Sequence, residues 1–599
     1  MSVLKFVNKT IVITGSGTGI GQAIAKRFAE HGANVIILGR RKEPLEETAK
    51  ILQQIITKAK SNAFVKIFPG VDVSDEKNIT SMFNSLKKSD VNVDIVVNNA
   101  GVSGPVTCFA NSPIDEFKST VAIHLSGTFW TSSQALRVMN PGSKIITIST
   151  FFTEERPLEQ RPYRFRSPYT ASQGAKNRLA EVMSWELKDR GIFSIATNPG
   201  PVHSDRIYKT VYPKAASEFL RVSGFEDLSP EQVQSASSEI LPLLGENEET
   251  VSNGIKKAAE NLAKTMGNKS EADVKRLTKT LSDLLAKIQT VAEKIQRNTS
   301  KMISDEQFLS QSQVAQMVMN LCDDEISKMI NGRVIPGDRV FYPVRPHITS
   351  TIPSMHQPDL SNQVFLLTID TAEKHDLERI QYLIENLGKN GGKVVCLISK
   401  NISREIQEVI NKKVQTNVVD LSNPAEVERS FNTAKNMGVI SAVIHVTGKV
   451  PQIGKLIELS RAEWDKLVEK FVNVPAVVAQ QSLNLFVPGG GKDPRLFKGK
   501  SGSVIIIGPD LPVGSKISEN ERAKVEVFRG ALRPFTTTVN QELSDVLKSN
   551  VRIFLVLPGS ITGKESNNER IFDAINYFNS DKAHSNSEVI FNPDETRVG

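Results

Sequence analysis

The sequence predicts an α/β protein with two tandem domains, each a doubly wound parallel sheet, and a helical hairpin inserted in the first. Three observations predict this fold. Short apolar runs alternate with stretches of helical spacing in both halves of the 599-residue chain, as they do where helices join parallel strands. Matching motifs occur in the same order in the two halves. A segment near the middle of the chain has almost no strand signal.

The first domain opens with a strand, a glycine-rich turn, a helix and a second strand. The two strands are expected at residues 9–14 and 35–38. Their apolar runs do not alternate with polar residues, which indicates strands that are buried on both faces, as in a parallel sheet. Further strands are expected at residues 65–68, 94–98, 144–148 and 193–197.

The segment 226–305 is predicted to be a helical insert. Its apolar residues recur every three or four positions, which is the spacing of one helix face. The two series are Val274, Leu277, Leu281, Leu284, Ile288, Val291 and Ile295, and Val251, Ile255, Ala258, Leu262 and Met266. We favour packing of these stripes within the chain over an intersubunit coiled coil, because coiled coils usually need about three or more heptads.

The sheet pattern resumes at residues 314–340, and a proline-rich stretch then indicates a linker. A second alternation of strands and helices begins at residue 364. The predicted division is therefore a first sheet domain at 1–225 plus 306–345, the helical insert at 226–305, a linker at 346–362 and a second sheet domain at 363–599.

The second domain repeats motifs of the first. Residues 445–448 stand where 98–101 stand, and residues 557–559 stand where 198–200 stand. Several matches in one order indicate two copies of one fold.

Composition excludes several classes of function. The net charge of +8, from 74 Lys and Arg against 66 Asp and Glu, is spread along the chain, so we expect no nucleic-acid partner. Three scattered cysteines exclude a disulfide scaffold, and the eight histidines form no ligand-spaced cluster, so no metal site is predicted. No apolar run is long enough to span a membrane, and we expect a cytoplasmic protein.

The turn after the first strand predicts a dinucleotide site of the Rossmann type. Glycines let the backbone turn tightly and approach a pyrophosphate, whose charge lies at the N-terminus of the next helix. A simple tight turn is the weaker interpretation, because the motif lies in a strand–turn–helix unit. The predicted cofactor-binding residues of the turn are Gly15, Ser16, Thr18, Gly19, Ile20 and Gly21.

Arg40 and Arg41 follow the second strand, where an acidic residue would bind the ribose 2′-hydroxyl of NAD. Two guanidinium groups suit a 2′-phosphate instead, so NADPH is the expected cofactor. A solvated arginine pair is the alternative.

Motifs throughout residues 8–205 support this prediction. They are Thr14-Gly15-x-x-x-Gly19-x-Gly21, Asn98-Asn-Ala-Gly101, Pro168-Tyr169-Thr-Ala-Ser172 and Asn198-Pro-Gly200. Together they resemble the short-chain dehydrogenase/reductase family. The resemblance implies that Tyr169 gives a proton to a carbonyl while the nicotinamide gives a hydride, and that Ser149 or Thr150 polarises the carbonyl oxygen. It also implies cofactor contacts at Asp72, Val73, Asn99, Ala100, Gly101, Tyr169, Pro199, Gly200 and Val202.

Two positions depart from the pattern of that family. The family has a Lys four residues after the Tyr, which lowers the tyrosine pKa, and an Asn that anchors a relay water. Here these positions hold Gln173 and His124. Lys176 lies two helical turns beyond Tyr169, where it could reach the ribose more readily than the phenol. His124 could relay protons itself. The alternative is that both replacements mark a site that has lost catalysis.

The whole chain is similar to the N-terminal half of the bifunctional malonyl-coenzyme A reductases, in which a reductase unit precedes a degenerate one. This similarity implies reduction of malonate semialdehyde to 3-hydroxypropionate, with a separate malonyl-coenzyme A-reducing partner that makes the semialdehyde. A homo-oligomer is also expected. Guanidinium groups suit a small acidic aldehyde, and the candidate substrate-binding residues are Arg164, Arg166 and Arg206. A solvated loop is the alternative for these arginines.

The second domain lacks both the glycine turn and the tyrosine. Residues 369–375 replace the turn. Counting back from Pro558 through Glu542, with a small insertion allowed, aligns Val525 with Tyr169 and Arg529 with Gln173. We therefore expect that this domain binds no dinucleotide and has a structural role. The alternative for the whole protein is a non-catalytic, nucleotide-binding scaffold or regulatory subunit of a partner reductase.

Overall fold

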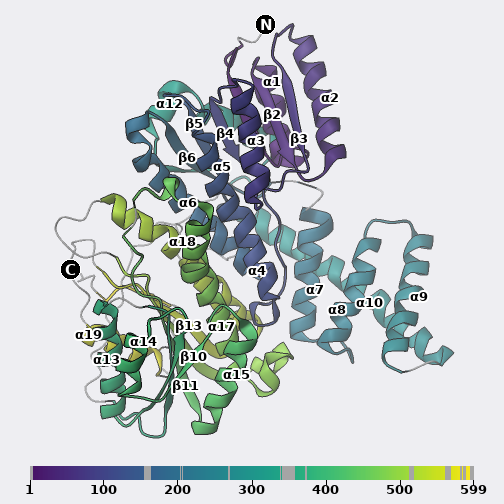
Figure 1. The fold of residues 1–599 in the computed structure, drawn as a ribbon. Helices are drawn as coiled ribbons and strands as arrows, with labels where there is room; N and C mark the ends of the chain where they lie inside the picture. Colours follow the sequence, from purple (N-terminus) through teal and green to yellow (C-terminus); the bar gives the residue numbers. More distant parts are fainter. Residues whose placement is uncertain are drawn as a thin grey trace.

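The computed structural model describes residues 4–153, 164–202, 204, 207–267, 270–337, 339, 358–371, 374–452, 454–511, 519–559, 568–580, 583 and 589–593. Two parallel sheets form the two domains, and helices cover both faces of each sheet (Figure 1). The predicted tandem α/β fold is therefore confirmed. Most of the predicted linker lies outside the described residues.

The first sheet has seven parallel strands in the order β3-β2-β1-β4-β5-β6-β7. The order reverses between β1 and β4, and such a reversal leaves a crevice at the carboxyl ends of the strands. The strands are β1 (Thr10–Thr14), β2 (Asn34–Gly39), β3 (Val65–Pro69), β4 (Ile95–Asn98), β5 (Lys144–Ile148), β6 (Phe193–Pro199) and β7 (Val334–Gly337).

Helices pack on both faces of this sheet through separate cores. On one face Phe28 of α1, Leu52 of α2 and Val318 of α11 pack against Ile11 and Ile13 of β1. Helices α3, α4, α5 and α6 belong to the core on the other face. The helices are α1 (Gly19–Glu30), α2 (Lys42–Lys58), α3 (Glu76–Lys88), α4 (Ile114–Val121), α5 (Gly127–Ala135), α6 (Ser167–Glu186), α11 (Gln311–Leu321) and α12 (Asp324–Met329).

A helical unit follows β6 and extends to the right of the first domain in Figure 1. It contains α7 (Tyr212–Ser223), α8 (Pro230–Ile240), α9 (Glu248–Thr265) and α10 (Glu271–Ser300). Ile255, Leu281 and Ile288 are buried in a core that these helices share. The predicted stripes therefore pack within the chain. The shared core also includes Ala216 of α7, which precedes the predicted start of the insert.

The second sheet repeats the strand order of the first, as β10-β9-β8-β11-β12-β13-β14. Its strands are β8 (Val364–Ile369), β9 (Lys393–Ser399), β10 (Thr416–Val419), β11 (Ile440–Val446), β12 (Ser501–Ile507), β13 (Asn550–Val556) and β14 (Ile590–Phe591). Its helices are α13 (Lys374–Lys389), α14 (Arg404–Asn411), α15 (Pro424–Ala434), α16 (Arg461–Val468), α17 (Val474–Leu485), α18 (Glu519–Gln541) and α19 (Asn568–Phe578).

The two domains share one hydrophobic core, which extends from β1 to the strands of the second sheet. Helices α6 and α18 approach closely at two glycines, since a Cβ on Gly530 would lie 3.1 Å from the carbonyl oxygen of Gly174. The indole of Trp464 stacks on Phe129, with ring centroids 4.0 Å apart. The second domain thus covers the apolar side of α5 and α6 in the first.

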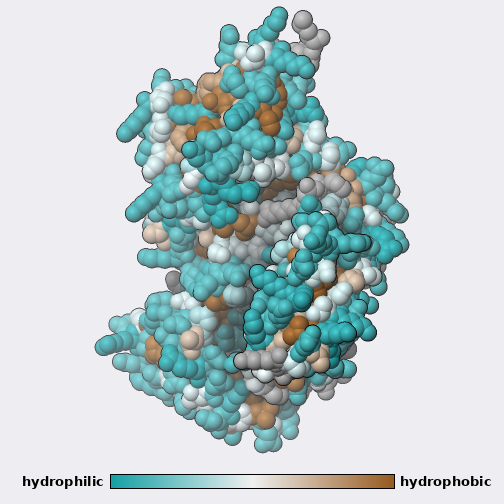
Figure 2. Space-filling model, turned by 90° about the vertical axis from the view of Figure 1, so that its right-hand side faces the viewer, coloured by the Kyte–Doolittle hydropathy of each residue, from teal (hydrophilic) through white to brown (hydrophobic). Residues whose placement is uncertain are grey.

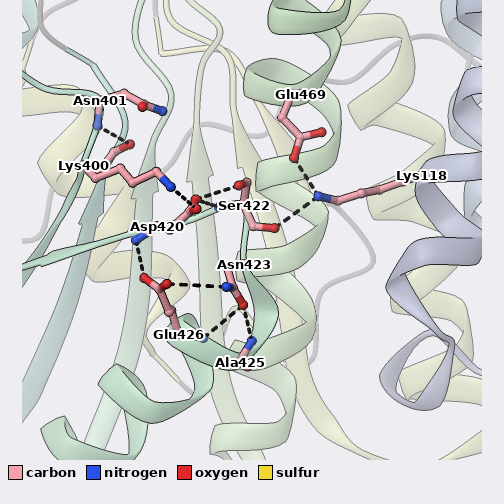
Figure 3. A network of polar contacts seen from close by, with 10 residues as sticks. Lys118, Lys400, Asn401, Asp420, Ser422, Asn423, Ala425, Glu426 and Glu469 are labelled. Carbon is pink, nitrogen blue, oxygen red and sulfur yellow. Dashed lines mark hydrogen bonds and ion pairs between the residues drawn. The ribbon is translucent and has the colours of Figure 1, made fainter.

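Polar contacts also join the domains. Lys118 of α4 donates to the carbonyl oxygen of Ser422 at 3.1 Å and pairs with Glu469 at 2.6 Å (Figure 3). Hydrophilic residues dominate the surface in Figure 2, where apolar residues gather mainly near the upper end. Across the described ranges, no helix combines the length and the apolar character that a membrane crossing requires.

Candidate functional site

The candidate site lies at the carboxyl edge of the first sheet, where the glycine turn joins β1 to α1. Gly15 has a φ of +67°, and a Cβ there would lie 2.8 Å from Cα of Ala100. A Cβ on Gly21 would collide with the carbonyl oxygen of Gly15 and the side-chain amide of Asn99. Both positions therefore require glycine, because the turn, the helix and the segment after β4 meet without room for a side chain.

The N-terminus of α1 suits an anionic group. Its N-cap residue Thr18 makes no side-chain capping bond, and the first turn contains no acidic residue. Gly19 has a φ of +66°, and no atom lies within 4 Å of the place where its Cβ would be. Unsatisfied N–H groups and the helix dipole attract phosphate, so this turn fits the pyrophosphate of a dinucleotide.

Two residues of the predicted turn have packing roles for their side chains. The Ser16 hydroxyl is fully buried, donates to the carbonyl oxygen of Ile13 at 2.9 Å and accepts the N–H of Leu38 at 3.1 Å. Ile20 packs against Val202. Ser16 therefore holds the turn against β2, and only its backbone is left to contact a ligand.

Arg40 and Arg41 lie at the end of β2, on the same edge of the sheet. Arg40 is exposed, and its guanidinium lies 3.7 Å from the carboxylate of Asp72. The other Asp72 oxygen accepts the N–H and the hydroxyl of Ser74 at 2.9 and 2.7 Å. Val73 is buried against Gly127. The charged groups thus border the place where the ribose end of a dinucleotide would lie.

The segment after β4 is tied to the glycine turn. The Thr14 hydroxyl accepts the N–H groups of Asn99 and Ala100, each at 2.9 Å. The Asn99 side chain donates to the carbonyl oxygens of Thr14 and Gly15. A Cβ on Gly101 would collide with the His124 ring. These contacts place the predicted cofactor residues from β1 and β4 side by side.

Tyr169 lies in the first turn of α6, between two groups that carry or accept protons. The Arg166 guanidinium lies over its ring, 4.0 Å from the centroid. The His124 ring meets it edge to face, with centroids 5.4 Å apart. A cation over an aromatic face is attracted by the ring. The structure therefore brings the predicted acid together with one of the predicted substrate arginines.

The two residues that depart from the family pattern touch each other. Nε2 of Gln173 lies 3.4 Å from Nδ1 of His124, and Nε2 of His124 lies 2.9 Å from the carbonyl oxygen of Val102. His124 occupies a π-helical turn, η2 (Ala122–Ser126). The second domain has a π-helical turn at the matching place, η8 (Glu469–Asn473), so this turn belongs to the shared fold and is not itself a sign of catalysis.

The hydroxyl candidates differ in what they bond. Ser149 donates its proton to the carbonyl oxygen of Gln173 at 2.9 Å, whereas the Thr150 oxygen accepts the N–H of Phe152. A hydroxyl carries one proton, so Thr150 keeps its proton for another acceptor. The geometry thus favours Thr150 between the two alternatives.

Lys176 does not extend toward the surface of the crevice. Its side chain is fully buried and donates to the carbonyl oxygen of Ile148 at 2.6 Å. Burial lowers the pKa of Lys176 to about 7, because an apolar environment disfavours the charged form. The expected contact with a ribose would require this bond to break.

The remaining candidates lie around the end of β6 and before α6. The Gly200 N–H donates to the carbonyl oxygen of Gly337, and the Pro199 carbonyl accepts the N–H of Phe151. Arg164 forms an ion pair with Asp545 of the second domain, which engages it at the interface. Arg206 lies outside the described residues.

Known proteins resemble this chain at two levels, in sequence over the first domain and in fold over the whole chain. The sequence model of short chain dehydrogenases matches residues 9–212. The chain is 31% identical over 269 residues to the uncharacterized oxidoreductase YxbG of Bacillus subtilis (strain 168), spanning 44% of this chain and 90% of that protein. The chain belongs to the short chain dehydrogenase family. It is also 31% identical over 202 residues to a 3alpha-hydroxysteroid dehydrogenase of Mediterraneibacter gnavus, over 33% of this chain and 76% of that protein.

Two solved structures match this short chain dehydrogenase over nearly its whole length. The C-domain of a bacterial malonyl-CoA reductase, solved with NADP, gives a TM-score of 0.71 at 17% identity and covers 96% of this chain and 95% of its own. The N-domain, also with NADP, gives 0.67 at 16% identity and covers 98% and 97%. Both domains share the tandem fold, so the fold likeness is not restricted to the N-terminal half.

The corresponding edge of the second domain is filled by side chains. Arg379 of α13 pairs with Asp510 at 2.6 Å, and both side chains are almost fully buried. A Cβ on Gly448 would collide with Thr371 and Asp376. Thr371 belongs to the segment that replaces the glycine turn of the first domain. Among the described residues, no cluster of His, Cys, Asp and Glu is arranged to hold a metal ion.

Sequence reasoning missed Glu542, a buried carboxylate of the second domain that accepts the N–H groups of Phe109 and Phe165. Phe165 directly precedes Arg166, and the segment of Phe109 contacts Phe165 through the bond from the Thr107 N–H to the Phe165 carbonyl oxygen. The signal was present in the alignment of the two domains, because counting back from Pro558 with a small insertion allowed places Glu542 where the first domain has Glu186.

Proposed function

We propose that the first domain uses NADPH to reduce a small acidic aldehyde, with malonate semialdehyde as substrate and 3-hydroxypropionate as product. The observation that carries this proposal is the Arg166 guanidinium 4.0 Å from the ring centre of Tyr169, which joins a carboxylate-binding group to a proton donor. A guanidinium suits a carboxylate, and a substrate of this length would present its aldehyde near the phenol.

The preference for NADPH rests on the arginine pair after β2. Arg40 is exposed beside Asp72, and Arg41 follows it at the start of α2. Their guanidinium groups would hold a 2′-phosphate, while the turn at Gly15, Gly19 and Gly21 would hold the pyrophosphate. When bound, NADPH supplies the hydride.

The protein's own groups handle the carbonyl oxygen and its proton. Tyr169 donates the proton to the oxygen, and Thr150 donates a hydrogen bond that polarises the carbonyl. The His124 ring meets the Tyr169 ring edge to face, and Gln173 contacts His124. These two residues take the place of the family's Asn and Lys. We propose that the histidine returns a proton from solvent to Tyr169 after the phenol has protonated the carbonyl oxygen, since a histidine exchanges protons near neutral pH.

NADPH oxidation in the presence of malonate semialdehyde tests the proposal, with Tyr169→Phe measured beside the wild type. We expect turnover that falls by about 100-fold or more in the variant, while the variant still binds NADPH. If the wild type binds NADPH but reduces no aldehyde, the protein is instead a nucleotide-binding scaffold or regulatory subunit of a partner reductase.

The replaced pair provides a second test. The variant carrying Gln173→Lys and His124→Asn together restores the family pattern, and the two residues must change together because they touch. We expect this variant to lose activity, since the wild-type pair forms part of a reorganised site. A large gain in rate would show that the site has decayed.

The proposed reaction also requires a source of substrate. We propose that a separate protein reduces malonyl-coenzyme A to the semialdehyde, and that the chain forms a homo-oligomer. Co-purification with such an activity and the mass of the native particle in solution test these two proposals. A monodisperse monomer would contradict the second.

A further inference from the structure

A carboxylate of the second domain reaches into the surroundings of Tyr169. Glu542 lies in η11 (Glu542–Val546), directly after α18, and its side chain is fully buried. One oxygen accepts the N–H of Phe165 at 2.7 Å and the other accepts the N–H of Phe109 at 2.8 Å. We propose that Glu542 is a positioning residue for the active site of the first domain.

The first of these segments ends at Arg166, the residue that lies over Tyr169. Phe165 has a φ of +67°, a conformation that residues with a Cβ adopt only when their surroundings impose it. Its N–H is held by Glu542, and its carbonyl oxygen accepts the N–H of Thr107 at 3.0 Å. The bond to Glu542 therefore helps to fix the direction in which Arg166 leaves the backbone.

The second segment follows β4 and packs against the first. Arg166 donates from Nε and Nη2 to the carbonyl oxygen of Ser103, at 3.2 and 2.9 Å. Farther along this segment, Glu218 of α7 accepts the N–H of Cys108 at 2.6 Å, and Glu542 accepts the next N–H, that of Phe109. One carboxylate of the second domain thus ties together the two segments that orient Arg166.

A neighbouring contact strengthens the hold of the second domain. Asp545, one helical turn beyond Glu542, forms an ion pair with Arg164. A buried backbone N–H needs an acceptor, and Glu542 supplies one to both Phe109 and Phe165. The residues before Arg166 are therefore held at two successive positions by the domain that lacks the catalytic tyrosine.

A glutamate of the first domain holds backbone N–H groups of the second domain in the same way, which provides a matched control. Glu186, at the end of α6, accepts the N–H groups of Leu456 and Ile457 at 2.8 and 3.0 Å. These residues belong to η7 (Leu456–Glu458) of the second domain. In that domain the position aligned with Tyr169 holds Val525. Glu186 therefore makes an equivalent interface contact with no catalytic group to position.

The experiment compares Glu542→Gln with Glu186→Gln in the full chain. It rests on the proposed function for its rate measurements and on amide hydrogen exchange for a readout that needs no activity. We expect Glu542→Gln to lower kcat for semialdehyde reduction roughly tenfold, with the NADPH dissociation constant within about twofold, and to speed exchange at Phe109 and Phe165. Glu186→Gln should leave kcat within about twofold and speed exchange at Leu456 and Ile457.

Equal losses of kcat in the two variants, or unchanged exchange at Phe165 in Glu542→Gln, would overturn the positioning role. If the wild type reduces no aldehyde, the proposed function fails, while the exchange pattern still decides the positioning role. Asp545→Ala extends the test to a partly exposed position. We expect it to speed exchange at Phe165 and to lower kcat less than Glu542→Gln does.

Discussion

The two sheet edges of this molecule have the same topology and opposite contents. At the first edge, a glycine turn leads into α1, whose N-cap residue makes no side-chain bond, and no atom lies within 4 Å of the place where a Cβ of Gly19 would be. At the second edge, the buried pair of Arg379 and Asp510 fills the corresponding place. One strand order thus supports a ligand crevice in one copy and a packed polar core in the other, which illustrates that function is carried by sites and not by folds.

The second domain is also in extensive contact with the first. It shares a core with the first domain, and Glu186 and Glu542 hold backbone N–H groups across the interface in both directions. Only the contact of Glu542 lies beside a catalytic candidate. If Glu542 positions Arg166 as proposed, the filled domain supports the open one.

The largest effect on cofactor binding is expected from adding a methyl group at each edge. Gly21→Ala would drive a Cβ into the carbonyl oxygen of Gly15. Overpacking of this kind costs about 3 kcal/mol of free energy. A loss of that size from the binding free energy weakens NADPH binding about 100-fold. Gly448→Ala would crowd Thr371 and Asp376 and lower stability without changing NADPH affinity. Fluorescence titration with NADPH measures both. Equal weakening by Gly448→Ala would mean that the second edge takes part in binding.

Breaking the buried ion pair should destabilise the second domain without affecting the cofactor. Asp510→Ala leaves the guanidinium of Arg379 buried without its partner, and such a change costs about 3–5 kcal/mol of unfolding free energy. Urea titration measures the loss. Replacing both residues, as Arg379→Met with Asp510→Leu, should recover part of it. A change in NADPH stoichiometry would contradict the separation of roles.

Glu542 and Glu186 should differ in how strongly they make the stability of the protein depend on pH. Burial raises the pKa of Glu542 to about 8, far above its unfolded value. The folded state therefore holds a proton that the unfolded state has lost, so stability falls as pH rises from about 4.5 to 8, by at most about 1.4 kcal/mol per pH unit. Thermal unfolding of Glu542→Gln should show a flatter pH profile than the wild type.

Burial also raises the pKa of Glu186, against the N–H groups that it accepts. Its side chain is less completely buried than that of Glu542, so Glu186→Gln should flatten the profile less. A larger change in Glu186→Gln than in Glu542→Gln would contradict the assignment.

The smallest effect concerns cofactor choice. Arg40→Ala should weaken NADPH binding about tenfold and leave NADH binding unchanged, since one exposed charge-assisted contact is worth about 1.4 kcal/mol. The second domain has the matching pair of Lys400 and Asp420 (Figure 3), and Lys400→Ala should change neither affinity. Equal loss of NADPH and NADH affinity in Arg40→Ala would argue against a 2′-phosphate contact.

The sequence by itself determined the strands, the glycine turn, the repeated fold and the apolar helix faces. Apolar runs predicted the strands, because a strand buried on both faces admits little else. Glycines at 15, 19 and 21 predicted the turn, because its backbone conformation and close contacts exclude side chains. The repeat of motifs predicted two copies of one fold, and the spacing of Leu277, Leu281 and Ile288 predicted helices with an apolar face.

Only the tertiary structure decided where several side chains lie. Lys176 is buried beneath β5, Arg164 is engaged by Asp545, and Arg166 lies over Tyr169. Glu542 meets Phe165 across 377 residues of sequence. Helix and turn signals arise within a few residues, whereas a side chain on a helix or loop takes its partner from whichever distant segment the packing of the two domains brings against it. That packing is a property of the whole chain.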